Sequence, residues 1–348
     1  MKEQVQAVSA WVKKYRLDIG VSLFLLLVAG LPRLLDLGVF LTADEKNWIG
    51  RSYEFIRAFK DFRFNDMMQT THPGVTTMWL SGFAITLKMY LSHIPFSFRN
   101  LAHFAAAAQF PIALTITLTF PLMYWWLKRL LHSRQLAVFA SLLIALDPFL
   151  IGYSRVVHVD ALVSHLLFLA VLATLLYARE QFSRQWLVIS AVATAVSILT
   201  KAPAIFMLPF LLLVMSLQLR GTTLSRPWVQ ERLRDLVIWL LIIGLLFVIF
   251  WPAILWVPDP EGNLLLIKRD LSIAAVTPHH MIEDYSLSPL HYVYTLITRT
   301  TPVIQLGLIA SLVFAIFSWI TKRKRQQQSA TTISADQVTG VMGRLAAY

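Results

Sequence analysis

Acidic and basic side chains occupy successive polar stretches of this sequence, and their types suit the transfer of a group away from an anion. Asp44 and Glu45 stand side by side in the first stretch. Arg155 and Asp160 lie five residues apart in the second, and Lys201 follows in the third. A carboxylate within hydrogen-bond reach of a hydroxyl group takes its proton. Cations fixed in a low-dielectric pocket stabilise a departing anion such as phosphate.

Most of these residues also have an ordinary structural explanation. A lysine such as Lys201 often anchors a helix end at a membrane surface. The HPG sequence that begins at His72 is typical of a turn, and His280, which follows another histidine, is of a kind usually exposed. Asp160 is harder to explain, because an ionisable group beside long apolar runs is costly unless it is paired or faces water. Arg155 is a plausible partner for it.

The composition indicates an all-α, polytopic membrane protein. The chain has 348 residues, of which 57% are hydrophobic and 14% charged, against about 25% charged in soluble domains. Several apolar runs reach the ~20 residues that cross a bilayer, and the sequence predicts about eight transmembrane helices. They cover residues 17–37, 101–127, 136–151, 161–178, 186–200, 202–219, 236–256 and 302–320, so the membrane domain spans 17–320, between an N-terminal segment 1–16 and a disordered tail 321–348.

A further apolar segment, 75–94, decides the topology. Lys88 lies in its middle, and a charge at the bilayer centre costs about 2.5–3.5 kcal/mol, so we expect this segment to be interfacial or re-entrant. One side of the membrane then carries 18 Lys and Arg against 6 Asp and Glu, which is the whole net charge of +12; the other side carries 13 of each. The positive-inside rule makes the basic side, with both termini, cytoplasmic. Asp44, Asp160 and Lys201 then face one extracytoplasmic site.

The order and spacing of the motifs resemble a known family. Arg33 precedes the acidic pair, HPGVTTMW follows at 72–79, SRVVHVDAL at 154–162 and LTKAPAIFMLPF at 199–210; WPAILWVPDP and HHMIEDYSLSPLHYVYTLITRTTP come later. Together they resemble the polyprenyl-phosphate-sugar-dependent glycosyltransferases of the GT-C superfold, in the group of protein O-mannosyltransferases and aminoarabinose transferases (family 39-like). The resemblance covers roughly residues 20–315. Typical members have more spans, and HPG replaces their commoner HPP or KPP.

The resemblance implies an inverting hexosyl transfer, mannose-like or of another hexose, from a polyprenyl-phosphate-linked sugar to a protein, lipid or glycan acceptor. It implies Asp44 as the general base, with Glu45 orienting the acceptor or Asp44. The transition state is oxocarbenium-like. The residues implied in binding the donor's phosphate or sugar are Arg155, Lys201, Arg33, Asp160 and, as secondary candidates, His72, His158 and His280.

Several alternatives remain open at this point. A transporter or lipid flippase would also carry ionisable residues among its spans, although no internal repeat is visible, and a third alternative is a structural subunit without chemistry. No cofactor is firmly implied; a divalent metal is possible, but no ligand spacing demands one. The absence of a P-loop or GxGxxG element speaks against a soluble nucleotide donor, and a positive cytoplasmic face explains the basic charge without nucleic acid. A bacterial inner membrane is favoured over the endoplasmic reticulum.

Overall fold

The protein, described here from a computed structural model, is built of helices. The structure describes residues 2–70, 73–217 and 225–254, with short stretches at 294, 302, 305–313, 316–317 and 321, and these contain no strand. The chain divides into two compact units, 1–278 and 279–348, and the first holds everything discussed below. Its α-helices are α1 (Lys2–Leu34), α2 (Glu45–Lys60), α3 (Val75–Ser92), α4 (Leu101–Leu131), α5 (Arg134–Ala145), α6 (Pro148–Ser154), α7 (Val159–Arg179), α8 (Arg184–Thr200), α9 (Met207–Leu217) and α10 (Arg226–Phe250); its 3₁₀ helices are η1 (Phe64–Met67), η2 (Phe98–Asn100), η3 (Ala202–Phe206) and η4 (Pro252–Ile254).

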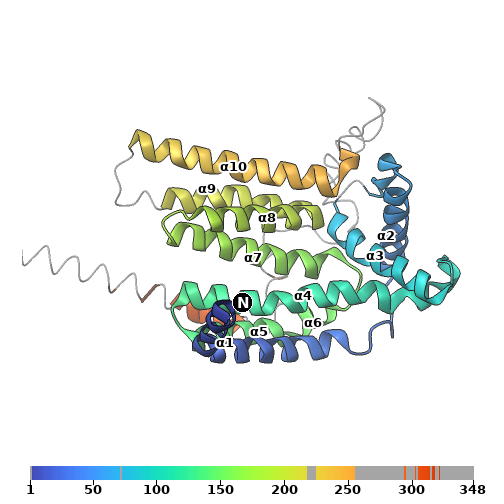
Figure 1. The fold of residues 1–348 in the computed structure, drawn as a ribbon, viewed down its shortest axis with the longest axis horizontal. Helices are drawn as coiled ribbons and strands as arrows, with labels where there is room; N and C mark the ends of the chain where they lie inside the picture. The colour runs from blue at the N-terminus through green and yellow to red at the C-terminus, as the bar shows by residue number, and fades with distance from the viewer. Residues whose placement is uncertain are drawn as a thin grey trace, which may run out of the picture. The chain divides into compact units, whose positions relative to one another are not determined.

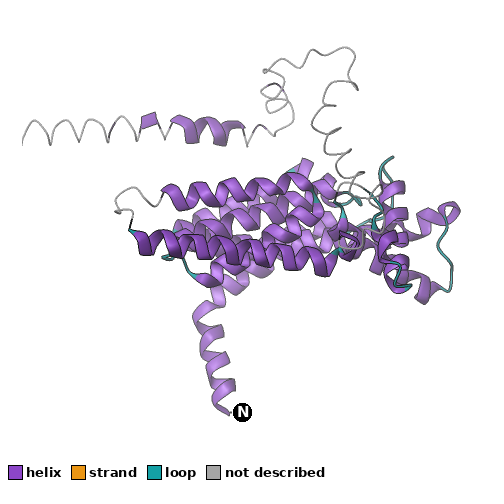
Figure 2. Ribbon diagram, turned by 90° about the horizontal axis from the view of Figure 1, so that it is seen from above, coloured by secondary structure: helices purple, strands orange, loops and turns teal. Residues whose placement is uncertain are grey.

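The long helices form one bundle. In Figure 1, α1, α4, α7, α8, α9 and α10 run side by side, while α2 and α3 gather at the end where α1 finishes and α4 begins. Figure 2 shows the same arrangement from above. A hydrogen bond between the Gly38 amide and Gln109 Oε1 (2.7 Å) joins the end of α1 to the start of α4. The intervening α3 therefore does not run the length of the bundle.

The spans only partly match the predicted number. Four helices of the described ranges are long and apolar enough to cross a membrane: Lys13–Leu34, Phe98–Leu131, Val159–Arg179 and Arg226–Phe250. Helices α5 and α6, bent by 61°, would together make a fifth, whereas α8 and the η3–α9 segment are shorter. The bend falls where Asp147 caps α6 and Pro148 opens it, because proline suits the first turn of a helix but not its interior. Of the predicted eighth span, 302–320, the structure describes 302, 305–313 and 316–317, and the tail 321–348 lies outside the described residues except for 321.

Helix α3 covers almost the same residues as the predicted segment 75–94. It is not among the helices long and apolar enough to cross a membrane. It packs closely on α2, since a Cβ at Gly82 would lie only 2.3 Å from the Ser52 carbonyl oxygen. Thr76 donates to the Val196 carbonyl of α8 (3.1 Å), and Trp79 donates to the Phe250 carbonyl of α10 (2.8 Å). The amphipathic α2 was not predicted, because the stretch between the predicted helix 17–37 and the segment 75–94 is too polar for a membrane span.

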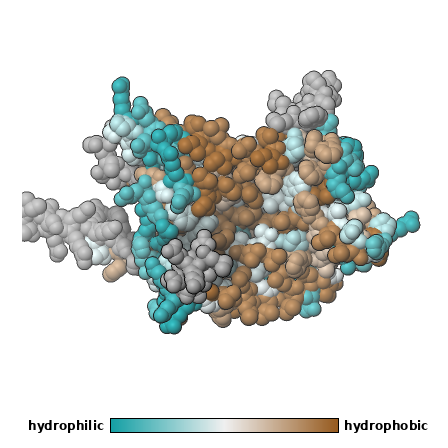
Figure 3. All heavy atoms as spheres, viewed as in Figure 1, coloured by the Kyte–Doolittle hydropathy of each residue, from teal (hydrophilic) through white to brown (hydrophobic). Residues whose placement is uncertain are grey.

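The opposite end of the bundle is basic. Asp18 is buried there and pairs with Lys128 (2.7 Å) and Arg134 (3.0 Å), while Arg129 pairs with Glu180. Figure 3 shows hydrophobic residues across the middle of the bundle and hydrophilic residues at both of its ends. This is the pattern of helices whose centres lie in hydrocarbon and whose ends lie in water.

Candidate functional site

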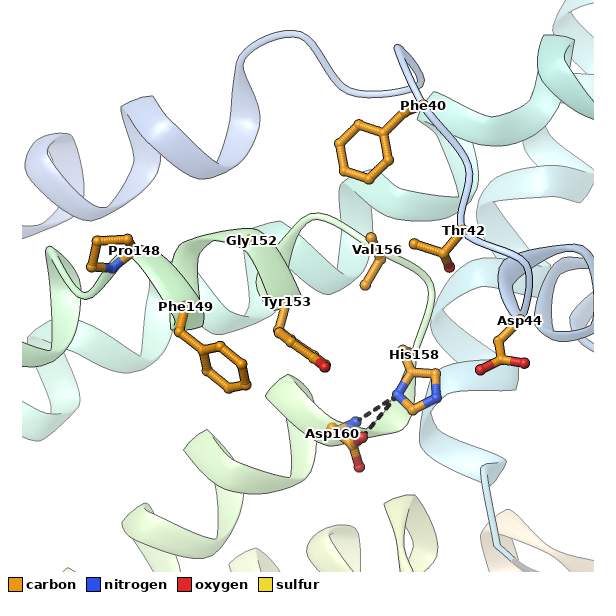
Figure 4. Close-up of a pocket in the computed structure, with 10 residues that line it drawn as sticks. All are labelled: Phe40, Thr42, Asp44, Pro148, Phe149, Gly152, Tyr153, Val156, His158 and Asp160. Atoms are coloured by element: carbon orange, nitrogen blue, oxygen red, sulfur yellow. Dashed lines mark hydrogen bonds and ion pairs between the residues drawn. The ribbon is translucent and has the colours of Figure 1, made fainter. Parts of the chain in front are cut away.

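A pocket of about 560 Å³ opens at the end of the bundle where α2 and α3 lie. Three short segments build it: the loop between α1 and α2, helix α6, and the loop that leads into α7 (Figure 4). The turn at Asp147–Pro148 redirects the chain so that α6 forms one wall. The lining residues are Phe40, Thr42, Asp44, Pro148, Phe149, Gly152, Tyr153, Val156, His158 and Asp160.

Asp160 stands in the first turn of α7 and is paired. Its carboxylate forms an ion pair with Lys201, which follows the last residue of α8. His158 caps α7, and its Nδ1 atom lies 3.2 Å from Asp160 Oδ2. Two predicted donor-binding residues, His158 and Asp160, thus line the pocket, and a third, Lys201, reaches it through the ion pair. Asp160 was predicted to orient Arg155 or the donor sugar. In the structure, the basic residue paired with Asp160 is Lys201.

Asp44 lines the pocket from the loop between α1 and α2, and it caps α2 only through its backbone. Its carbonyl accepts from the amides of Asn47 (3.1 Å) and Trp48 (3.2 Å), and its side chain makes no capping bond. Within the part of the chain that the structure describes, the exposed Asp44 carboxylate has no hydrogen-bond donor or cation bound to it. A carboxylate in this state is free to accept a proton from a bound hydroxyl group.

Glu45, next in sequence, is fully buried and does not line the pocket. Its Oε2 accepts from the Thr42 amide (2.7 Å). Its Oε1 accepts from Gln109 Nε2 and from the Val157 amide, both at 2.8 Å. One carboxylate therefore joins the loop that carries Asp44, helix α4, and the loop that carries His158 and Asp160. This geometry suits a residue that positions Asp44 rather than one that contacts the acceptor.

The two predicted arginines lie beside the pocket and do not line it. Arg155 donates to the carbonyls of Pro32 (2.8 Å) and Asp36 (2.9 Å), at the end of α1. Arg33 is fully buried, donates to the Ala145 carbonyl (2.8 Å) and lies over the Phe120 ring. Both guanidinium groups thus satisfy helix-terminal carbonyls in this structure, which stabilises the fold of α1 against α5 and α6.

Two further predictions fall outside the described residues, those for His72 and His280. The described residues hold no group of three or more histidine, aspartate or glutamate side chains suited to a metal ion.

The structure adds residues that the sequence analysis missed. Thr42, Phe149 and Tyr153 line the pocket, and the rings of Phe149 and Tyr153 lie 4.5 Å apart on α6. Gln109 has the position described above, on α4. Tyr153 immediately precedes the SRVVHVDAL motif at 154–162. Gln109 is an amide inside an apolar run, and its position could have signalled a role, because a buried polar group needs a partner.

The described fold is that of a polytopic membrane protein, and its pocket contains the Asp44 carboxylate, unpaired among the described residues, and the cluster of His158, Asp160 and Lys201. A comparison with family models matches residues 73–257, just over half of the chain, to dolichyl-phosphate-mannose-protein mannosyltransferase. The chain belongs to this family and is a membrane glycosyltransferase, as the resemblance predicted. No curated protein sequence matches it.

Proposed function

We propose that this protein transfers a mannose-like hexose from a polyprenyl-phosphate donor to a hydroxyl group of a protein, lipid or glycan, with inversion, and that Asp44 is the general base. The observation that carries the proposal is the contrast between the two carboxylates of the pocket. Asp160 is neutralised by Lys201, whereas Asp44 is exposed and makes no side-chain capping bond. Only Asp44 is therefore ready to take a proton.

The reaction needs few groups. Asp44 takes the proton of the acceptor hydroxyl. As it does so, the acceptor oxygen bonds to the anomeric carbon, and the bond from that carbon to the phosphate oxygen breaks. The electron pair leaves with polyprenyl phosphate, an anion stable enough to need no general acid. Positive charge near the departing phosphate lowers the barrier. Inversion requires the acceptor and the phosphate on opposite faces of the hexose, so in this proposal the hexose lies between Asp44 and the ammonium group of Lys201.

Lys201 is the cation best placed for the phosphate, because its ammonium group pairs with Asp160, which lines the pocket, and its side chain is 42% exposed. Arg155 and Arg33 stay candidates, but their guanidinium groups would first have to release the backbone carbonyls that they bind before they could bind phosphate.

We expect Lys201→Gln to raise the donor KM about tenfold, equivalent to about 1.4 kcal/mol, while the acceptor KM stays constant. Steady-state kinetics with each substrate varied in turn measure this. A defect confined to the acceptor KM would contradict the phosphate assignment.

A second cavity, of about 730 Å³ and almost entirely apolar, is proposed to hold the polyprenyl tail. Its wall comes from α2, α3, α4 and α10 and includes Trp79, Phe83, Ala84, Phe110 and Phe250. Helix α3 links it to the site, since Thr76, one turn before Trp79, is bound to α8 five residues before Lys201.

Filling this groove should discriminate between donors by tail length. Ala84→Phe is expected to raise the KM of a long-chain polyprenyl donor at least several-fold, because the added ring displaces buried isoprene units. A donor with a short, citronellyl-type chain should be transferred as by the wild type. Equal effects on both donors would remove the groove from tail binding.

The proposed orientation puts the pocket on the extracytoplasmic side of a bacterial inner membrane, with both termini cytoplasmic. Its support is the basic opposite end of the bundle, where Lys128, Arg129 and Arg134 lie, together with the positive-inside rule.

The decisive assay of the activity supplies purified protein with polyprenyl-phosphate mannose and hydroxyl acceptors. Acceptor-dependent release of polyprenyl phosphate, with the sugar recovered on the acceptor, is the expected result. Movement of the donor across a vesicle membrane without a glycosylated product would instead favour a flippase.

A further inference from the structure

A third cavity, of about 380 Å³, lies at the basic end of the bundle, away from the candidate site. Its lining combines indoles and cations: Trp125, Trp126, Lys128 and Arg129 from the last turns of α4, and Trp186 from the first turn of α8. The glycosyl transfer proposed above uses none of these residues.

The charges around this cavity leave an excess of positive charge. Lys128 pairs with Asp18 (2.7 Å), and Arg129 donates from Nη2 to Glu180 (2.7 Å). Arg134 shares the same Asp18. Three cations thus meet two carboxylates, and Arg129 remains 59% exposed in its side chain. An anion that enters this cavity is attracted by the excess positive charge, and it can approach a cation while the ion pairs with Asp18 and Glu180 remain.

Two of the three indoles are held by hydrogen bonds. Trp125 donates to Ser22 Oγ (3.0 Å) and Trp186 donates to Glu180 Oε2 (2.9 Å). Lys128 Nζ lies 5.2 Å from the ring centre of Trp125, and the guanidinium carbon of Arg129 lies 5.5 Å from that of Trp186. Each cation is therefore held both by a carboxylate and by an aromatic face.

Trp126 differs from its two neighbours. Its ring packs edge-on against Trp186, with centroids 5.4 Å apart. Among the described residues no acceptor is bound to its indole N–H, and the side chain is only partly buried. The cavity thus offers a neutral donor next to two cations, a combination that suits a phosphate oxygen.

We propose that this cavity binds the phosphodiester head of an anionic glycerophospholipid, such as phosphatidylglycerol, in the leaflet opposite the candidate site. Charge complementarity selects an anion. A lipid fits better than a soluble phosphate because three indoles form the wall, and because hydrophobic residues cover the adjoining middle of the bundle for acyl chains (Figure 3). Tryptophan and basic residues between helices are the means by which membrane proteins hold anionic lipid heads.

The test titrates the detergent-solubilised protein with phosphatidylglycerol or phosphatidylcholine and counts bound lipids by native mass spectrometry. We expect tighter binding of phosphatidylglycerol, weakened about fivefold by Arg129→Gln. This variant leaves Lys128 and Arg134 on the buried Asp18, so the fold should persist. Arg184→Gln, which removes an exposed cation of the same end that does not line the cavity, should bind like the wild type.

Trp126→Phe provides an independent variant that keeps an aromatic ring but removes the indole N–H, and it too should weaken phosphatidylglycerol binding. Equal binding of the two lipids, or wild-type affinity in both cavity variants, would overturn the proposal. Displacement of phosphatidylglycerol by millimolar inorganic phosphate would also overturn it, since it would identify a site for a soluble anion.

Discussion

Asp44→Asn is expected to lower kcat for glycosyl transfer by about 10²- to 10⁴-fold, the usual contribution of a general base. The amide has the size of the carboxylate but cannot take the acceptor proton. Because Asp44 makes no side-chain capping bond, the substitution should leave thermal stability and donor KM almost unchanged. Single-turnover transfer from a labelled polyprenyl-phosphate sugar measures the chemical step directly.

Asp61→Asn is the matched control, since Asp61 is an exposed acid at the other end of α2 whose only ion pair is with Arg63 within the described residues. It should transfer sugar like the wild type. Undiminished turnover in Asp44→Asn would remove Asp44 from the role of base. A loss of kcat with Asp160→Asn, at wild-type donor KM, combined with an active Asp44→Asn would move the base to Asp160.

Glu45→Ala should destabilise the protein by about 3 kcal/mol and abolish most of the transfer activity. The substitution removes the acceptor of three donors: the buried side-chain amide of Gln109, the buried N–H of Val157 and the part-buried N–H of Thr42. Each unsatisfied donor costs about 1–3 kcal/mol, offset in part because a buried charge is also removed. Thermal unfolding in detergent measures the loss of stability. Activity falls because the loops that carry Asp44 and Asp160 lose their common anchor.

Glu54→Ala tests whether the loss of stability in Glu45→Ala arises because Glu45 is buried. Glu54 lies on the same helix and pairs with Arg57, but its side chain is 44% exposed, so the change should cost no more than about 1 kcal/mol.

Gln109→Ala combined with Glu45→Ala should lose less stability than the sum of the two single variants, because both remove the same hydrogen bond. Strict additivity would show that the two side chains do not act together.

Much of the fold follows from the sequence because hydrophobic length is a local property. The long run that begins at 101 reads directly as α4, and α3, which contains Lys88, is not among the helices long and apolar enough to span a membrane. Helix α2 was missed, since a polar segment with one buried face looks like a loop when its partner, α3, is unknown. Helices α8 and α9 were predicted as spans on composition alone, and their lengths are shorter than such a span requires.

The site shows a similar division. Residue type and motif order predicted Asp44, Asp160 and Lys201 as site residues, and in the structure Asp44 and Asp160 line one pocket while Lys201 pairs with Asp160. Their partners depend on three-dimensional contacts between distant segments. The ion pair of Asp160 with Lys201 joins residues 41 positions apart, and the hydrogen bond of Gln109 to Glu45 joins residues 64 positions apart. The sequence alone gave no reason to prefer these pairings, and it placed Arg155 on the phosphate rather than on the end of α1.

The most direct test of the account labels single cysteines, since the natural chain has none. Thr42→Cys and Gly152→Cys line opposite walls of the pocket, and a side chain fits at Gly152 because a Cβ there meets nothing within 4 Å. Gln135→Cys marks the basic end, on α5. In intact cells, a membrane-impermeant thiol reagent should label the first two and not the third, and polyprenyl phosphate should protect both pocket positions. Labelling of Gln135→Cys alone, or protection of neither pocket cysteine, would contradict a single extracytoplasmic site that binds the lipid donor.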